Sequence, residues 1–159
     1  MKSIGVVVDD AGAAIVSVER KDDDLLATGI ERLPFDLAVV ARRVRELDEP
    51  DVRFVVDSEG IGNALWMALG GPTDPRHWQL YSGRGMERQA LVDPLLVAIQ
   101  EGRFHFAPNL SEQPSMSKAM VGFRRSVKDD GLIGSELVVA LLLAIHNPVT
   151  VAEGWFAYA

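Results

Sequence analysis

The chain has 159 residues, of which 48% are apolar and 25% charged, as is ordinary for a single globular domain with its own core. We therefore predict one domain spanning residues 1–159. The absence of cysteine excludes disulfides and thiolate metal sites. No secretory signal follows Met1, and the longest apolar run, Leu137 to Ile145, is too short to cross a bilayer. We expect a cytoplasmic protein with no membrane partner.

The net charge of −7 counts against nucleic-acid binding, because such proteins usually present a basic face. A site that holds divalent cations, however, concentrates carboxylates, and bound cations reverse the local sign. Basic residues also cluster in two places, and we take them as candidates for contact with a phosphate backbone. These residues are Arg84, Arg88, Arg124, Arg125 and Lys128. For isolated surface cations, solvation is the simpler interpretation.

Three strands are predicted first, at residues 4–9, 13–19 and 25–33. The turns between them are short, which indicates an antiparallel meander. A helix then begins at Pro34 or Asp36, with apolar residues at helical spacing as far as Leu47.

Residues 52–57 are almost continuously apolar, as in a central parallel strand covered on both faces. A short helix ending at Gly70-Gly71 follows, with Trp66, Met67 and Leu69 expected in the core. Residues 78–81 are predicted to form another strand.

The remaining pattern is mainly helical. A helix over 87–101 contains Pro94, where we expect it to be interrupted and to restart with Asp93 as cap. A short strand at 103–107, a helix at 115–125 and a loop at 128–134 come next. Ser135 is predicted to cap a last helix that ends at Asn147-Pro148. The histidines show no paired metal spacing, and His146 is interpreted as a favourable charge near that helix end.

A meander that leads through helical crossovers into parallel strands predicts an α/β fold. Its central sheet would be mixed, with helices on both faces. This is the element order of the ribonuclease H-like fold.

Three carboxylates stand at the ends of these apolar elements. Asp9 ends the first strand, Asp57 ends the 52–57 strand, and Glu136 opens the final apolar helix. A charge at the end of a buried element costs free energy unless it is paired or binds a metal. We therefore predict that the three converge on one metal site, with neighbouring Asp10, Glu59 and Asp130 as substitute ligands.

Each carboxylate also has a simpler interpretation. Asp9 can pair with the backbone of the Ala11-Gly12 turn, and Asp57 can cap the helix that follows it. Glu136 is favoured in the first turn of a helix by the helix dipole alone.

Four blocks resemble the nuclease domain of phage terminase large subunits, in the family's order. They are residues 4–11 (IGVVVDDA), residues 55–62 (VVDSEGIG, an Asp-x-x-Gly-x-Gly block), residues 91–104, and residues 135–144 (SELVVALLLA). The resemblance implies a duplex DNA endonuclease of phage DNA packaging, active in the host cytoplasm. It implies Mg²⁺ or Mn²⁺, as two ions held by Asp9, Asp57 and Glu136, with Asp57 as the bridging ligand.

The chain departs from that family in two respects. The family's closing helix usually begins with two adjacent aspartates, where this chain has Ser135-Glu136. The chain also has no Gly-x-x-x-x-Gly-Lys-Ser/Thr motif, so no nucleotide cofactor is expected. The resemblance implies an ATPase motor, on an excised segment or a separate chain, and a portal as partners.

Two alternatives stay open on the sequence. The Ser135-Glu136 substitution and the acidic charge are compatible with a degenerate, non-catalytic binding module on the same fold. A resolvase of the RuvC type or a ribonuclease uses the same carboxylate logic on another substrate.

Overall fold

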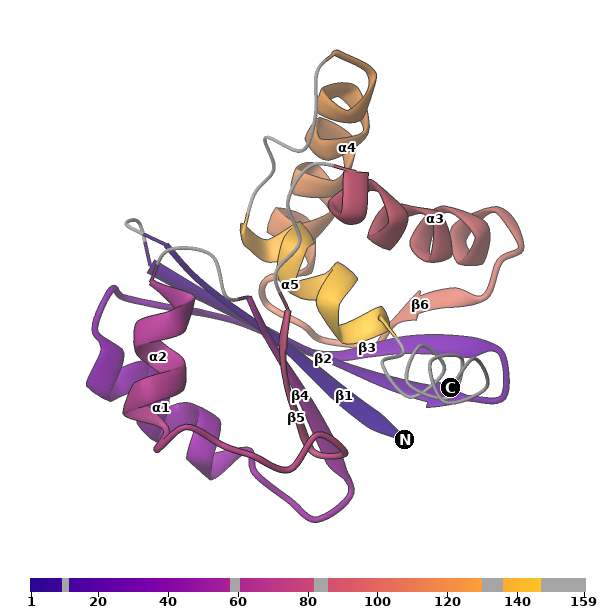
Figure 1. Ribbon diagram of the computed structural model, residues 1–159. Coiled ribbons are helices and arrows are strands. Elements are labelled where there is room, and N and C mark those ends of the chain that lie inside the picture. The colour runs from indigo at the N-terminus through magenta and orange to yellow at the C-terminus, as the bar shows by residue number, and fades with distance from the viewer. Residues whose placement is uncertain (10–11, 58–60, 82–85, 130–135, 147–159) are drawn as a thin grey trace.

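The computed structural model describes residues 1–9, 12–57, 61–81, 86–129 and 136–146, with the backbone alone at 86–90 and 123–129. Six strands form one sheet in the order β5-β4-β1-β2-β3-β6, with helices on both faces (Figure 1). The strands are β1 (Lys2–Asp9), β2 (Gly12–Lys21), β3 (Asp24–Leu33), β4 (Val52–Asp57), β5 (Trp78–Tyr81) and β6 (Phe104–Phe106). The helices are α1 (Leu37–Glu46), α2 (Gly62–Ala68), α3 (Met86–Gln100), α4 (Gln113–Asp129) and α5 (Glu136–Ile145).

The sheet is mixed, as predicted. β1, β2 and β3 form the antiparallel meander, while β4 pairs parallel to β1, β5 parallel to β4, and β6 parallel to β3. Each parallel strand is reached through a helical crossover, since a short turn can join only antiparallel neighbours. The predicted α/β, ribonuclease H-like arrangement is therefore confirmed.

The two faces of the sheet bury different cores, because successive strand residues point in opposite directions. In β1, Val6 and Val8 pack with α1 and α2, whereas Val7 packs with α3, α4 and α5. In β4, Val55 follows Val7 onto the α5 face, and Phe54 and Val56 lie on the other. All six residues of β4 are buried, as expected for a central strand covered on both faces.

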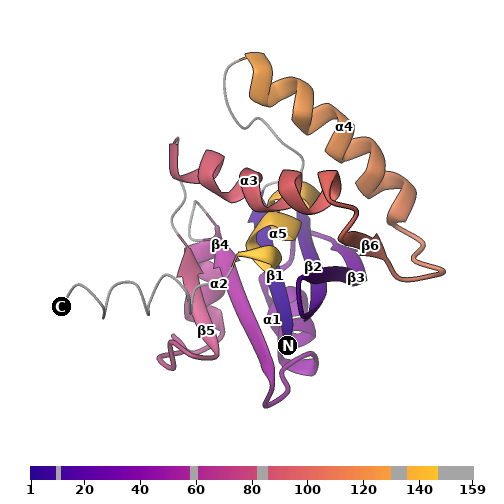
Figure 2. The ribbon, with the colours of Figure 1, turned by 90° about the vertical axis from the view of Figure 1, so that its right-hand side faces the viewer.

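α5 is the central helix of the molecule. It packs on β1 and β2, and α3 and α4 lie on its far side (Figure 2). Every residue from Leu137 to Ile145 is buried. A helix that is apolar all round is stable only when it is covered all round, and the two layers supply that cover.

Gly5 allows α5 to approach the sheet closely. A Cβ at this position would lie 1.9 Å from the carbonyl oxygen of Ala140. Any side chain on Gly5 would therefore push the helix away from β1.

Three local predictions are wrong. α3 runs through Pro94 without a break, because the one backbone hydrogen bond lost there is offset by burial of Leu91 and Leu95 on either side. α4 extends to Asp129, beyond the predicted end at 125 and into the predicted loop, since each added residue gains a bond once a helix has started. Met67 is 70% exposed, because the seven-residue α2 buries only the side that carries Leu65.

One predicted helix start is confirmed, and two other predictions concern residues that the structure does not describe. Asp36 caps α1, accepting hydrogen bonds from the backbone N–H groups of Ala38 and Val39. The predicted cap Ser135 and the predicted stop at Asn147-Pro148 lie outside the described residues. None of the helices in the described ranges is long and apolar enough to cross a membrane.

Candidate functional site

Asp9 and Asp57 lie at the same edge of the sheet. Each is the last residue of its strand. β1 and β4 are parallel neighbours, and their pairing extends as far as Val6 opposite Val56. One step further along this ladder, Asp57 comes level with Val7, and Asp9 follows two residues later. Both aspartates therefore fall on the side of the sheet that α5 covers.

Asp57 is almost buried, with 6% of its surface exposed. Gly62 opens α2 directly against it, and a Cβ on Gly62 would lie 1.5 Å from the Asp57 carbonyl oxygen. Only glycine permits this approach, which explains the last glycine of the Asp-x-x-Gly-x-Gly block. The residue at the N-cap of α2 is Ile61, whose side chain makes no capping hydrogen bond. Asp57 is therefore not the N-cap residue of α2.

Asp9 does take part in the turn that follows it. The backbone N–H of Gly12 donates a hydrogen bond of 3.1 Å to Asp9 Oδ1. A carboxylate offers about four acceptor positions, so this bond leaves Asp9 with capacity for another ligand.

Glu136, the first residue of α5, lies at the same edge, on the face of the sheet that this helix covers. Arg32 in β3 pairs with Ala14, which pairs with Val7, so Arg32 lies in the same cross-strand row as Val7. The strands β1 and β2 separate it from Asp57 in β4. The Nη2 of Arg32 lies 3.6 Å from Glu136 Oε1, so the N-terminus of α5 lies at this end of the sheet. The Nε of Arg32 lies 3.9 Å from Glu112 Oε2, just before α4. Arg32 thus stands between two carboxylates.

The sequence reasoning missed Arg32, although a signal was present. Arg32 has the same strand parity as Ile30, which is buried in the core that contains α5, although Arg32 itself is exposed. A cation at the end of a strand, on the face that otherwise carries buried apolar residues, indicates a carboxylate partner on the helix that covers this face.

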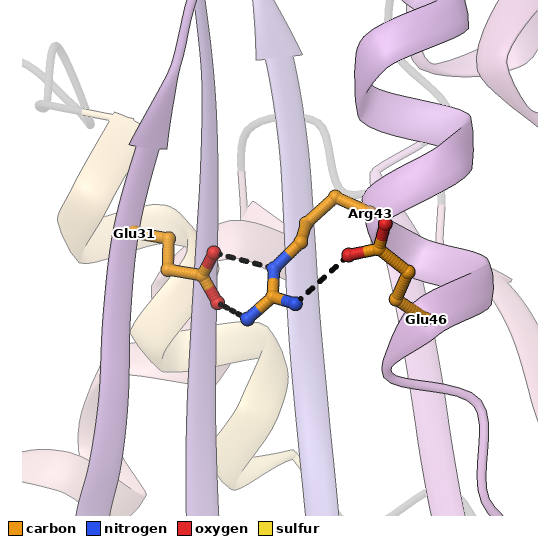
Figure 3. A network of polar contacts seen from close by, with 3 residues as sticks. All are labelled: Glu31, Arg43 and Glu46. Atoms are coloured by element: carbon orange, nitrogen blue, oxygen red, sulfur yellow. Dashed lines mark hydrogen bonds and ion pairs between the residues drawn. The ribbon is translucent and has the colours of Figure 1, made fainter.

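Glu31, the neighbour of Arg32 in sequence, forms an ion pair on the opposite face of the sheet. Glu31 faces the other side of the sheet, where it accepts two hydrogen bonds from Arg43 of α1, at 2.7 and 3.0 Å (Figure 3). Arg43 also donates to Glu46 at 3.1 Å. These bonds raise the pKa of Arg43 further above its ordinary value. This is a closed, two-pronged ion pair that ties α1 to β3.

Several predicted site residues cannot be placed. Asp10, Glu59, Asp130 and Arg84 lie outside the described residues. The predicted DNA-contacting residues Arg88, Arg124, Arg125 and Lys128 belong to α3 and α4, but their side chains are likewise outside the description. In the described part of the chain, no group of three or more acidic or histidine side chains could hold a metal ion as it stands.

His146 follows α5 and is not the favourable charge that was expected. Its ring is partly buried and meets the ring of Tyr81 edge-on, with centroids 5.2 Å apart. Burial lowers the pKa of His146 below its ordinary value, so the neutral form is favoured.

A hollow of about 840 Å³ lies at the opposite end of β4, away from the aspartates. Its lining carries both signs of charge, with Arg53 and Arg76 beside Asp51 and Asp74. Mixed charge indicates no particular ligand, so we place the candidate site at the carboxyl edge of the sheet.

The donor set at that edge suits a hard divalent cation. Carboxylate oxygens are the ligands that Mg²⁺ and Mn²⁺ prefer. Asp9 and Asp57 fit by face and by position, whereas Glu136 is engaged by Arg32.

No protein-family model matches the sequence, and no curated protein matches it either. Solved structures do match. The terminase nuclease domain of human cytomegalovirus, soaked with Mn and bound to an inhibitor, aligns at a TM-score of 0.57 and 16% identity over 89% of this chain and 81% of that one. The nuclease domain of the large terminase of bacteriophage SPP1, with bound Mn, aligns at 0.56 and 13% identity over 76% and 67%.

These similarities define the fold. The chain has a ribonuclease H-like fold. Within that class, its arrangement of sheet and helices is that of terminase nuclease domains.

Proposed function

We propose that this protein is a metal-dependent endonuclease that hydrolyses phosphodiester bonds of duplex DNA. One observation carries the proposal: Asp9 and Asp57 end adjacent parallel strands on one face of the sheet, under the N-terminus of α5. The fold supports the same conclusion, because both neighbours described above are nuclease domains, one soaked with Mn and the other with bound Mn.

The side chains have distinct tasks in this proposal. Asp57 is held by its near burial and by the close packing of Gly62, so little ordering remains to be lost when a ligand binds. Asp9 and Glu136 supply further oxygens. Two divalent cations about 4 Å apart, when bound, would activate water and stabilise charge on the attacking and leaving oxygens.

We further propose a role in phage or viral DNA packaging, by analogy with the terminases to which the two neighbours belong. An ATPase motor and a portal would then be partners. For DNA contact, the candidates stay Arg84, Arg88, Arg124, Arg125 and Lys128, whose charges would offset the acidic surface.

The test is plasmid nicking by purified protein with Mn²⁺, Mg²⁺ or EDTA. Asp57→Asn should abolish nicking while the circular dichroism spectrum stays native, because the amide removes charge and keeps shape. Asp51→Asn is the matched control, since Asp51 is exposed and precedes the other end of the same strand. Equal nicking by wild type and Asp57→Asn would refute the assignment.

A second candidate is a non-catalytic binding module on the same fold. The pairing of Glu136 with Arg32 and the Ser135-Glu136 substitution favour it. Well-folded wild-type protein that neither nicks plasmid nor responds to Mn²⁺ would support this candidate over the nuclease.

A further inference from the structure

Arg32 forms an ion pair with Glu136, a proposed metal ligand. Its guanidinium lies 3.6 Å from Glu136 and 3.9 Å from Glu112, and 47% of its side chain is exposed. The side chain of Glu136 is more buried, at 24% exposed. The inner partner of Arg32 is thus the residue that opens α5 at the candidate site.

The contacts of Arg32 differ in kind from those of Arg43. Arg43 grips Glu31 with two hydrogen bonds of 2.7 and 3.0 Å. Arg32 makes two longer ion pairs with two different carboxylates, in an exposed position where such pairs are weak. The first arrangement is suited to holding two elements together, and the second to exchange.

We propose that Arg32 is a built-in competitor for the divalent cation at Glu136. Without metal, the guanidinium neutralises Glu136 and draws it toward β3. With metal, Glu136 turns to the cation, and Arg32 keeps Glu112 as its partner. Arg32 acts through Glu136 and is therefore a positioning residue. This inference rests on the proposed function, since it concerns the same metal site.

Two physical effects predict how removal of the Arg32 charge changes the affinity for metal. Arg32 occupies a ligand that the cation needs, and its positive charge repels a divalent cation nearby. Both effects weaken metal binding, so removal of the charge should strengthen it. If Arg32 merely oriented Glu136 for the metal, removal would weaken binding instead.

The test is Mn²⁺ titration of the metal-free protein by calorimetry at fixed ionic strength. We expect Arg32→Gln to tighten Mn²⁺ binding by about fivefold, a modest coupling for an exposed pair. Arg32→Lys should stay near wild type, because it restores the charge. Arg43→Gln is the matched control and should leave the affinity unchanged, since that residue faces the other side of the sheet.

Substitution of Glu112 provides a second, independent test. Glu112→Gln should weaken Mn²⁺ binding, because Arg32 then depends on Glu136 alone. The same change should have little effect in the Arg32→Gln background. An effect of equal size in both backgrounds would reflect long-range charge and would overturn the proposal.

The outcomes separate this inference from the nuclease assignment. Wild-type binding that is lost in Asp57→Asn but unchanged or weakened in Arg32→Gln would refute the role of Arg32 and leave the metal site standing. Binding by Arg32→Gln alone would support competition strongly. Absence of Mn²⁺ binding in every variant would overturn both.

Discussion

Asp57 and Gly62 illustrate how single residues build the candidate site. A carboxylate that is 6% exposed is costly unless charge or hydrogen bonds compensate it. Gly62 brings the start of α2 against the carbonyl of Asp57, which fixes the backbone on which that carboxylate stands. The strand end is therefore rigid, as a preorganised ligand requires.

His146 gives a prediction at the same scale. Because burial lowers its folded-state pKa below the ordinary value of 6.5, the unfolded chain binds a proton more readily. Stability from the neutral ring is complete above pH 6.5, and it is lost as pH falls toward the lower folded pKa. Urea unfolding of wild type and His146→Phe across pH 5–8 measures this effect.

His146→Phe keeps a ring against Tyr81 and removes the titration. The variant should lose less stability than wild type between pH 7.5 and 5, since other groups titrate equally in both. Parallel pH profiles would contradict the assignment of a depressed pKa to His146.

At the scale of elements, α5 connects the core to the site. Its apolar residues fill the space between the sheet and the outer helices, and its first residue, Glu136, stands at the sheet edge. The position of that carboxylate therefore depends on how closely the helix packs on β1. Gly5 sets this distance.

Gly5→Ala should destabilise the protein by about 3 kcal/mol, because overpacking against the rigid carbonyl of Ala140 forces α5 to move. Gly29→Ala is the matched control in β3. A Cβ there would meet only the Ser17 side chain, whose Oγ would lie at 3.4 Å and Cβ at 3.5 Å, so we expect a change within about 1 kcal/mol. Chemical denaturation measures both, and equal effects would show that the close approach at Gly5 is unimportant.

At the scale of the whole molecule, charge governs how the protein responds to cations. The chain carries a net charge of −7, and the candidate site gathers carboxylates at one edge of the sheet. A ligand that binds only the folded state stabilises it by mass action. Thermal unfolding should therefore report metal binding without any assay of activity.

Saturating Mn²⁺ should raise the midpoint of thermal unfolding by about 5–10 °C, from a stabilisation of about 2.7 kcal/mol at a hundredfold excess over Kd. The shift should vanish in Asp57→Asn and persist in Asp51→Asn. A shift of equal size in all three proteins would indicate non-specific binding to the acidic surface.

The sequence determined the order and type of the elements, because hydrophobic period and turn residues are local properties. The meander, the central strand at 52–57 and the apolar helix after Ser135 were all predictable in this way. Local predictions failed where tertiary packing outweighed the local preference of a residue. Pro94 is tolerated within α3 because packing against α5 compensates for the lost bond.

Only the tertiary structure decided which face each charged residue serves. The register of β4 on β1 brings Asp57 and Asp9 to one edge, and the register of β3 on β2 brings Arg32 into the same cross-strand row as Val7. Glu31 and Arg32 are adjacent in sequence and yet serve different sites on opposite faces. Strand pairing joins residues far apart along the chain, and no local pattern encodes the partner of such a residue.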